Sequence, residues 1–311
     1  MSLRYNSYGA WLQKEFGGRV YKVSVDGGFT CPNRDGAIAR GGCSYCNNDS
    51  FRAAGVSARL LVEDQVRQGI RFLESRFGAS RFIVYWQHYT NTYAPVDRLR
   101  SMFARSFEAD SRIVGIAVGT RADCVEEEKL DMLRELAQGR HVCLEYGLES
   151  IYESTLTRLN RGHDIACWED AVLRTKRRGL PVCAHVILGF PWETRDEMLA
   201  YPGELNRLAI DFVKIHHLHV VRHTALGREY ESKPFWTFSY DEWIPFVCDF
   251  LERLSPGVVV QRLFGWAPDA DVLAPHWNRS KAEILRDIRR ELERRDSRQG
   301  KLVEGVDRSC W

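Results

Sequence analysis

The sequence predicts an α/β protein whose core is a partial (β/α)6 barrel of the TIM-like kind, followed by a small C-terminal α/β extension. Two observations lead to this prediction. Short runs of β-branched and aromatic residues alternate with amphipathic segments, which is typical of βαβ units around a parallel sheet. Polar residues also follow most of the expected strands, and the reactive groups of parallel barrels gather at those strand ends. Six such units make an incomplete version of the eightfold barrel.

The expected core elements alternate along the chain. Strands are expected at Tyr21–Asp26, Arg81–Gln87, Ile113–Thr120, Val142–Leu148, Pro181–Leu188 and Asp211–Val220. Helices are expected between them at Val62–Phe77, Val96–Phe107, Glu126–Ala137, Ile165–Arg178 and Arg195–Leu208. Each crossover between parallel strands therefore has its own helix, as a parallel connection requires.

The C-terminal extension is expected to begin within Arg222–Thr237, so that residues 1–225 form the core and residues 226–311 the extension. Its expected elements are a helix at Tyr240–Leu254, a strand at Val258–Leu263 and a long charged helix at Lys281–Arg298.

Composition favours a cytoplasmic protein without a membrane segment. Hydrophobic residues make up 44% and charged residues 28% of the 311 residues, which is ordinary for a globular protein. No apolar run approaches the ~18–20 residues that span a bilayer, and Met1–Phe16 lacks an apolar stretch of the signal-peptide kind. The net charge of +2 is lower than that of many dedicated nucleic-acid binders, although a net value says nothing of local patches.

A loop at residues 27–51 carries three cysteines in a short space. Cys31 is followed by eleven residues and then by Cys43-Ser44-Tyr45-Cys46. Three thiolates suit a 4Fe–4S cluster and leave one iron open. An open iron of this kind chelates S-adenosylmethionine (SAM), whose reductive cleavage yields a 5′-deoxyadenosyl radical. The alternative is a zinc knuckle, for which a distant histidine would have to supply the fourth ligand.

This loop resembles that of the radical SAM superfamily, in which an earlier cysteine precedes a C-x-x-aromatic-C tail. The wide gap between Cys31 and Cys43 departs from the commonest cysteine spacing of the superfamily. It resembles the spacing in the group related to the elongator catalytic subunit. Within that group the chain is similar to the YhcC-type family. The matching segments are CPNRDG (31–36), YTNTYA (89–94), GTRADC (119–124), LEYGLES (144–150), LNRGH (159–163), HVILGFPWET (185–194), KIHHLHVV (214–221) and APHWNRSK (274–281).

The resemblance implies a partial barrel of the radical SAM type, SAM as a cofactor, and one 4Fe–4S cluster on Cys31, Cys43 and Cys46. It also implies that Tyr45 lies beside the adenine of SAM. An electron donor such as flavodoxin or ferredoxin is an expected partner, because reductive cleavage of SAM consumes an electron.

The ends of the second and third strands hold four candidate SAM-binding residues. In the superfamily the second strand ends at the methionine part of SAM, often with a Gly-Gly-Glu motif that is absent here. Gln87 and Thr90 are the expected substitutes, with a structural turn as the alternative. Thr120 and Arg121 are expected to bond the ribose or the carboxylate, since the arginine fork matches two carboxylate oxygens. The alternative for Arg121 is a surface salt bridge.

The fourth and fifth strands add four candidate cofactor residues. Glu145 and Glu149 share a face with Gly147 by alternation, and buried acids are rare unless paired or functional. The resemblance implies that Glu149 contacts the SAM ribose. His185 and Ile187 share a face of the fifth strand, and Ile187 either contacts the adenine or belongs to the core.

The last core strand carries the candidate catalytic residues Lys214, His216 and His219. Alternation puts Lys214 and His216 on one face, and His217 and His219 on the other. Histidines here would act as acid or base groups or bind an anion at physiological pH. For any single histidine, an ordinary hydrogen-bonded role is the alternative.

The leading functional hypothesis is modification of an RNA base, in tRNA, because relatives in the resembled group act on macromolecules and often on wobble uridine. Two basic runs, Arg174–Arg178 and Lys281–Lys301, are either phosphate contacts or solvated helix faces. The alternatives are a radical SAM enzyme that acts on a protein or small metabolite, and a zinc-binding interaction module without chemistry.

Overall fold

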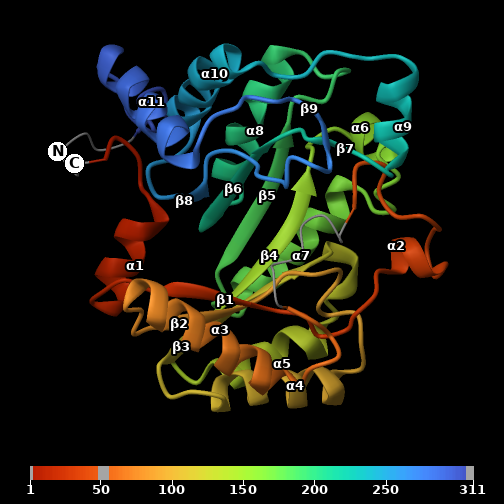
Figure 1. Cartoon of the computed structure of the whole chain (residues 1–311), viewed down its shortest axis with the longest axis vertical. Helices are drawn as coiled ribbons and strands as arrows, with labels where there is room; N and C mark the ends of the chain where they lie inside the picture. The colour runs from red at the N-terminus through yellow and green to blue at the C-terminus, as the bar shows by residue number, and fades with distance from the viewer. Residues whose placement is uncertain (1–2, 48–55, 306–311) are drawn as a thin grey trace.

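The computed structural model describes residues 3–47 and 56–305. In this part of the chain, parallel strands form one curved sheet in the order β1-β2-β3-β4-β5-β6-β8 (Figure 1). These strands are β1 (Tyr21–Val25), β2 (Phe82–Trp86), β3 (Ile113–Thr120), β4 (His141–Glu149), β5 (Val182–Leu188), β6 (Phe212–His217) and β8 (Val259–Arg262). A small antiparallel pair consists of β7 (Val220–Val221) and β9 (Val272–Ala274).

Helices fill the crossovers and cover the outside of the curved sheet, with α10 and α11 at one corner and α4 and α5 along the opposite edge (Figure 1). The helices are α1 (Tyr8–Phe16), α2 (Pro32–Asp35), α3 (Val62–Phe77), α4 (Val96–Glu108), α5 (Glu127–Ala137), α6 (Glu153–Arg158), α7 (Ile165–Arg177), α8 (Arg195–Arg207), α9 (Ala225–Ser232), α10 (Tyr240–Arg253) and α11 (Lys281–Arg294). A 3-10 turn, η2 (Ala122–Cys124), follows β3.

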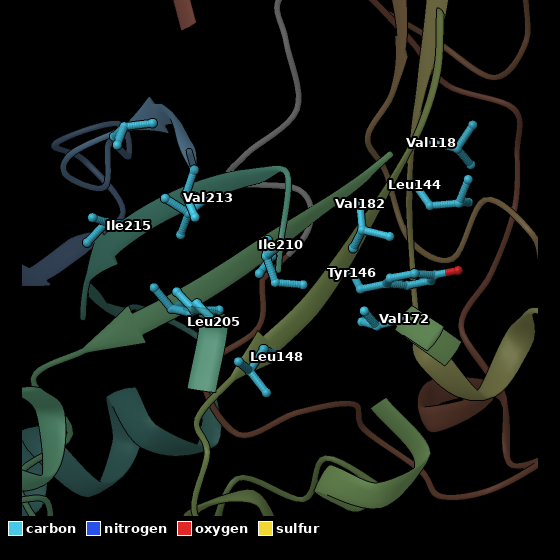
Figure 2. Packing of buried hydrophobic residues seen from close by; sticks show 14 of the residues in the cluster. Val118, Leu144, Tyr146, Leu148, Val172, Val182, Leu205, Ile210, Val213 and Ile215 are labelled. Atoms are coloured by element: carbon cyan, nitrogen blue, oxygen red, sulfur yellow. The ribbon is translucent and has the colours of Figure 1, made fainter. Parts of the chain in front are cut away.

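The main hydrophobic core lies between the sheet and the outer helices. Tyr146 of β4 and Val182 of β5 belong to the same buried cluster as Val172 of α7 (Figure 2). Every residue of β2 is buried, because the inner face of the sheet is covered as well. The strands therefore appear in the sequence as nearly continuous apolar runs.

Helix α1 covers the inner face of the sheet near the N-terminal ends of the strands. It begins where the Ser7 side chain accepts a hydrogen bond from the Ala10 N–H, and it ends at Gly17 with φ of 67°. Trp11 packs edge-on against Phe212, with ring centroids 4.8 Å apart, and Leu12 is buried in a cluster with Ala117. Helix α1 thus gives the barrel an apolar base.

The predicted elements agree closely with this fold. The third strand and the Val62–Phe77 helix have the predicted bounds, and four other core strands end within one residue of them. The strand predicted at Asp211–Val220 is wrong beyond His217, where the backbone leaves the sheet before β7. The last helix ends at Arg294, four residues before the predicted Arg298.

The residues after 225 take part in the same sheet as the core. Strand β8 pairs in parallel with β6 and becomes the seventh strand of the sheet. The boundary predicted between residues 225 and 226 falls at the start of α9, and it stays a prediction. Among the described residues, no helix is long and apolar enough to cross a membrane.

Candidate active site

A cavity of about 260 Å³ lies at the C-terminal ends of the parallel strands. Its walls come from the cysteine loop, from the ends of the core strands and from β8. The structure brings every candidate residue of the sequence analysis to this one cavity: Cys31, Cys43, Tyr45, Cys46, Gln87, Thr90, Thr120, Arg121, Glu145, Glu149, His185, Ile187, Lys214, His216 and His219. The position is the one at which parallel barrels place their reactive groups.

The backbone after α6 holds the cysteine loop in place. The Asn160 side-chain amide donates to the Gly42 carbonyl at 2.9 Å, and the Ser44 N–H donates to the Leu159 carbonyl at 2.9 Å. Gly42 has φ of 82°, and a Cβ there would meet the Arg34 side chain at 2.9 Å. Residues 48–51 of the predicted loop lie outside the described residues.

Two nitrogen donors approach the Cys43 sulfur. The Asn33 amide nitrogen is 3.5 Å from Cys43 Sγ, and Arg161 Nη1 is 3.7 Å from it. Arg161 Nη2 also donates to the Gly147 carbonyl at 2.8 Å and lies 4.0 Å from the Glu149 carboxylate. These donors stabilise negative charge on the sulfur. By contrast, burial raises the pKa of the Cys46 thiol to about 12, and the nearby thiol of Cys43 adds to the effect.

Glu145 is the centre of a buried polar cluster beneath the cavity. Its carboxylate accepts from Lys22 Nζ at 2.9 Å, from His185 Nε2 at 2.9 Å, and from Lys214. Burial alone would raise the pKa of Glu145, but Lys214, Lys22 and His185 together hold it well below its usual value. Both oxygens of Glu145 accept hydrogen bonds from side chains of the protein, and Glu145 also lines the cavity. The cofactor contact predicted for it stays a prediction.

The buried polar cluster around Glu145 also shifts the pKa values of Lys214 and His185. Lys214 Nζ donates to the Tyr85 hydroxyl at 2.9 Å, and burial lowers the pKa of Lys214 to about 8 despite the neighbouring carboxylate. Burial and the charge of Lys214 lower the pKa of His185 to about 4. His185 is therefore neutral at pH 7, while Lys214 remains mostly protonated.

His216, His217 and His219 all line the cavity, whereas alternation predicts His216 on one face of the strand and the other two on the opposite face. Strand alternation itself ends at His217, the last residue of β6, so it does not extend to His219. His217 stacks on Trp277, with ring centroids 3.8 Å apart, and His219 lies 4.2 Å from His217. Burial lowers the pKa of His219 to about 4 and that of His216 well below its usual value.

A family model described as the radical SAM superfamily matches residues 33–201, and one described as the radical SAM C-terminal domain matches residues 210–294. The chain is a radical SAM enzyme. The protein YtqA of Bacillus subtilis is 36% identical over 307 residues, which are 98% of this chain and 94% of YtqA. YhcC of Escherichia coli K12 is 37% identical over 273 residues, 88% of this chain and 87% of YhcC.

The fold of this radical SAM enzyme also matches a solved structure of archaeal Elp3 from Methanocaldococcus infernus. The TM-score is 0.72 at 19% identity, and the match covers 90% of this chain and 64% of that Elp3 chain. The family membership sets aside the non-catalytic zinc module. The family uses a 4Fe–4S cluster and SAM, and cleavage of SAM there supplies a 5′-deoxyadenosyl radical.

The residues around the three cysteines fit such a cofactor pair. Buried nitrogens with no hydrogen-bond partner among the described residues include Arg161 Nε and Arg121 Nη1, and both side chains line the cavity. Buried polar nitrogens of this kind call for an acceptor. Cys31, Cys43 and Cys46 would hold the cluster, and the thiolate form would be favoured by the cluster irons against the effect of burial.

The candidate SAM-binding residues line the wall next to the cysteines. Arg121 binds Asp123 through two hydrogen bonds of 2.8 and 2.7 Å, so its remaining Nη1 is the donor left for a ligand. Arg121 is buried, so its ion pair with Asp123 is not the surface salt bridge given as the alternative. The Thr120 hydroxyl lies 2.5 Å from that of Thr92. Glu149 has φ of 63°, and burial raises its pKa.

Sequence reasoning did not select several residues that the structure places at this site. Asn33 and Arg161 lie within the CPNRDG and LNRGH segments, so the resemblance contained a signal for both. Arg262 is the last residue of β8, and the strand-end rule would have selected it. Lys22 and Trp266 had no comparable signal.

We expect Arg121→Ala and Glu149→Ala each to weaken SAM binding at least tenfold, about 1.4 kcal/mol, because both side chains stand on the wall beside the cysteines. Equilibrium binding of SAM to the anaerobic holoenzyme measures this. Arg100→Ala is the matched control, since Arg100 pairs with Glu135 far from the cavity lining. Wild-type affinity in both site variants would refute the assignment.

Proposed function

We propose that this radical SAM enzyme modifies a base of an RNA, and that the RNA is a tRNA. The supporting observation is a row of arginine and lysine side chains that extends from the cavity to its rim. These side chains have no carboxylate partner among the described residues. Arg262, Arg279 and Lys281 form no ion pair with any described residue. Arg262 lines the first cavity, and Arg279 and Lys281 line an adjoining cavity of about 320 Å³.

The two cavities meet at His217, His219 and Trp266, which line both. The Trp266 side chain is 55% exposed, and Lys281 Nζ lies 4.6 Å from the centre of its ring. Exposed aromatic rings beside cations are the usual platform for unpaired bases. A base enters such a site only after leaving its stack, at a cost of a few kcal/mol.

The basic runs of the sequence analysis are less suited to phosphates than this rim. On α11, Arg290 and Arg294 pair with acids of the same helix, Asp287 and Glu291. On α7, Arg174 pairs with Asp170. Helix α7 also ends just before β5 begins, so this run lies at the strand ends opposite the cavity. The first residue of α11, Lys281, is the part of the runs that reaches the cavities.

Mass spectrometry of tRNA nucleosides from cells with and without the gene tests the proposal. A nucleoside that is absent from the mutant cells and restored by the wild-type gene, but not by Cys43→Ala, is the expected result. If all nucleosides are unchanged, the proposal of a tRNA substrate fails, and a protein or a small metabolite becomes the expected substrate.

We expect Arg279→Glu/Lys281→Glu to weaken tRNA binding and to reduce the slope of log affinity against log salt by about two, because each phosphate contact contributes roughly one. Filter binding at several salt concentrations measures both quantities. Arg290→Glu/Arg294→Glu is the control with the same change of charge, and we expect a smaller change of slope, since these arginines are already paired. Equal slopes for the two double variants would contradict the assignment of the rim.

A further inference from the structure

We infer that the cavity wall formed by Lys214, His216 and Arg262 is a binding site for an anionic group, a phosphate or a carboxylate, that the substrate carries into the barrel. The inference rests on the proposed function in taking this wall as the substrate's side of the cavity. The three residues come from neighbouring parallel strands, β6 and β8, and Lys214 stands opposite Arg262 in the register. All three line the cavity.

The charges around this wall do not balance within the described residues. Lys22, Lys214 and Arg262 are three cations, and the carboxylate of Glu145 pairs with Lys22 and Lys214. Besides burial, the charge of Arg262 acts on Lys214 as a like charge and lowers its pKa. Glu145 already accepts from Lys22, Lys214 and His185. The Arg262 side chain forms no hydrogen bond and no ion pair with any residue that the structure describes. An unpaired cation in a partly buried site is unfavourable, and an anion there would relieve it.

The donors on the wall match an oxyanion. Arg262 presents an unused guanidinium fork, which bonds two oxygens of a carboxylate or phosphate side by side. Lys214 has three ammonium hydrogens, of which Tyr85 and Glu145 take two. His216 Nε2 is buried and has no hydrogen-bond partner among the described residues. Three side chains thus have donor capacity directed at the same space.

The carboxylate of SAM is a competing occupant. The nitrogen available to it on the cysteine side is Arg121 Nη1, and the superfamily resemblance assigns Arg121 to SAM. An anion on the opposite wall would therefore belong to the substrate. In an RNA it would be the phosphate of the target nucleotide or a carboxylate carried by its base. A carboxylate would make the reacting base itself anionic, unlike an unmodified uracil ring, whereas a phosphate would be common to every nucleotide.

Calorimetric titration of the anaerobic holoenzyme, saturated with SAM, tests the inference with inorganic phosphate and with acetate at constant ionic strength. We expect at least one of these anions to bind the wild type, and its dissociation constant to rise at least tenfold in Arg262→Gln. Arg262→Lys keeps the charge but loses the fork, so its dissociation constant should lie between the two. Arg290→Gln is the charge-matched control on α11 and should bind like the wild type.

The pattern across the two anions identifies the group, since phosphate alone points to a phosphoryl group and acetate to a carboxylate. Binding that disappears in Lys281→Gln but persists in Arg262→Gln would move the site to the rim and overturn the inference. Equal binding by wild type and Arg262→Gln, or binding only in the absence of SAM, would overturn it too. These titrations use no RNA. Their result can therefore be told apart from a failure of the proposed function, which the mass spectrometry of tRNA nucleosides tests.

Discussion

Replacement of Cys31, Cys43 or Cys46 by alanine is expected to abolish 5′-deoxyadenosine production and the visible charge-transfer absorption of the cluster. A 4Fe–4S cluster held by two cysteines lacks a ligand that the chain cannot replace, because no other cysteine lines the cavity among the described residues. Anaerobic reconstitution, followed by absorption spectra and product chromatography, measures both effects. The expected loss of activity is complete within the detection limit.

Cys167→Ala is the matched control for these variants. Cys167 is a half-buried thiol on α7 that does not line the cavity, so its removal should leave the spectrum and the SAM cleavage unchanged. Production of 5′-deoxyadenosine by any of the three cavity variants would reject the ligand assignment.

Glu145→Leu is expected to lower the free energy of unfolding by about 3–5 kcal/mol, because it leaves the buried charge of Lys214 and the half-buried charge of Lys22 without their carboxylate. Urea unfolding of the anaerobic holoenzyme, followed by circular dichroism, measures the change. Glu229→Leu is the control, since Glu229 forms an exposed ion pair with Arg158. A pair of that kind contributes about 0–1 kcal/mol.

A second variant tests whether Glu145→Leu loses stability through unbalanced charge or through poorer packing. Glu145→Leu/Lys214→Met removes one of the stranded cations together with the carboxylate, so it should recover part of the loss. A double variant that is less stable than Glu145→Leu would contradict this account, as would a Glu145→Leu protein no less stable than Glu229→Leu.

The sequence was most informative where hydrophobic periodicity and burial coincide. The bounds of β3 and α3 were predictable because buried strands and amphipathic helices impose their own spacing on apolar residues. Helices α1 and α9 escaped prediction, although Ser7 and Thr224 cap them. Both helices are short, so few of their residues report a helical period, and the apolar residues of α1 also face partners that lie far away in the sequence.

The sequence predicted which residues lie at the candidate site better than it predicted what each of them does there. The strand-end rule and the resemblance brought fifteen residues to one cavity, since a parallel sheet fixes where its strands end. The hydrogen-bond partners of Glu145 were not predictable, because Lys22 and Lys214 are separated from it by 123 and 69 residues. A sequence indicates that a side chain points inward, whereas its partners depend on how the sheet curves.

The position of α1 has a consequence for the order in which the protein is made. This helix is synthesised long before β8, yet it packs on β8, and the Asn6 carbonyl accepts a hydrogen bond from the Val260 N–H at 2.7 Å. Contacts between such distant segments form late, because the intervening chain must first be closed into a loop. The base of the barrel therefore cannot be sealed until Val260 has been synthesised. Until then, Trp11 lacks the Phe212 and Val259 cluster that covers it in the folded protein, and exposed apolar surface of this kind favours aggregation.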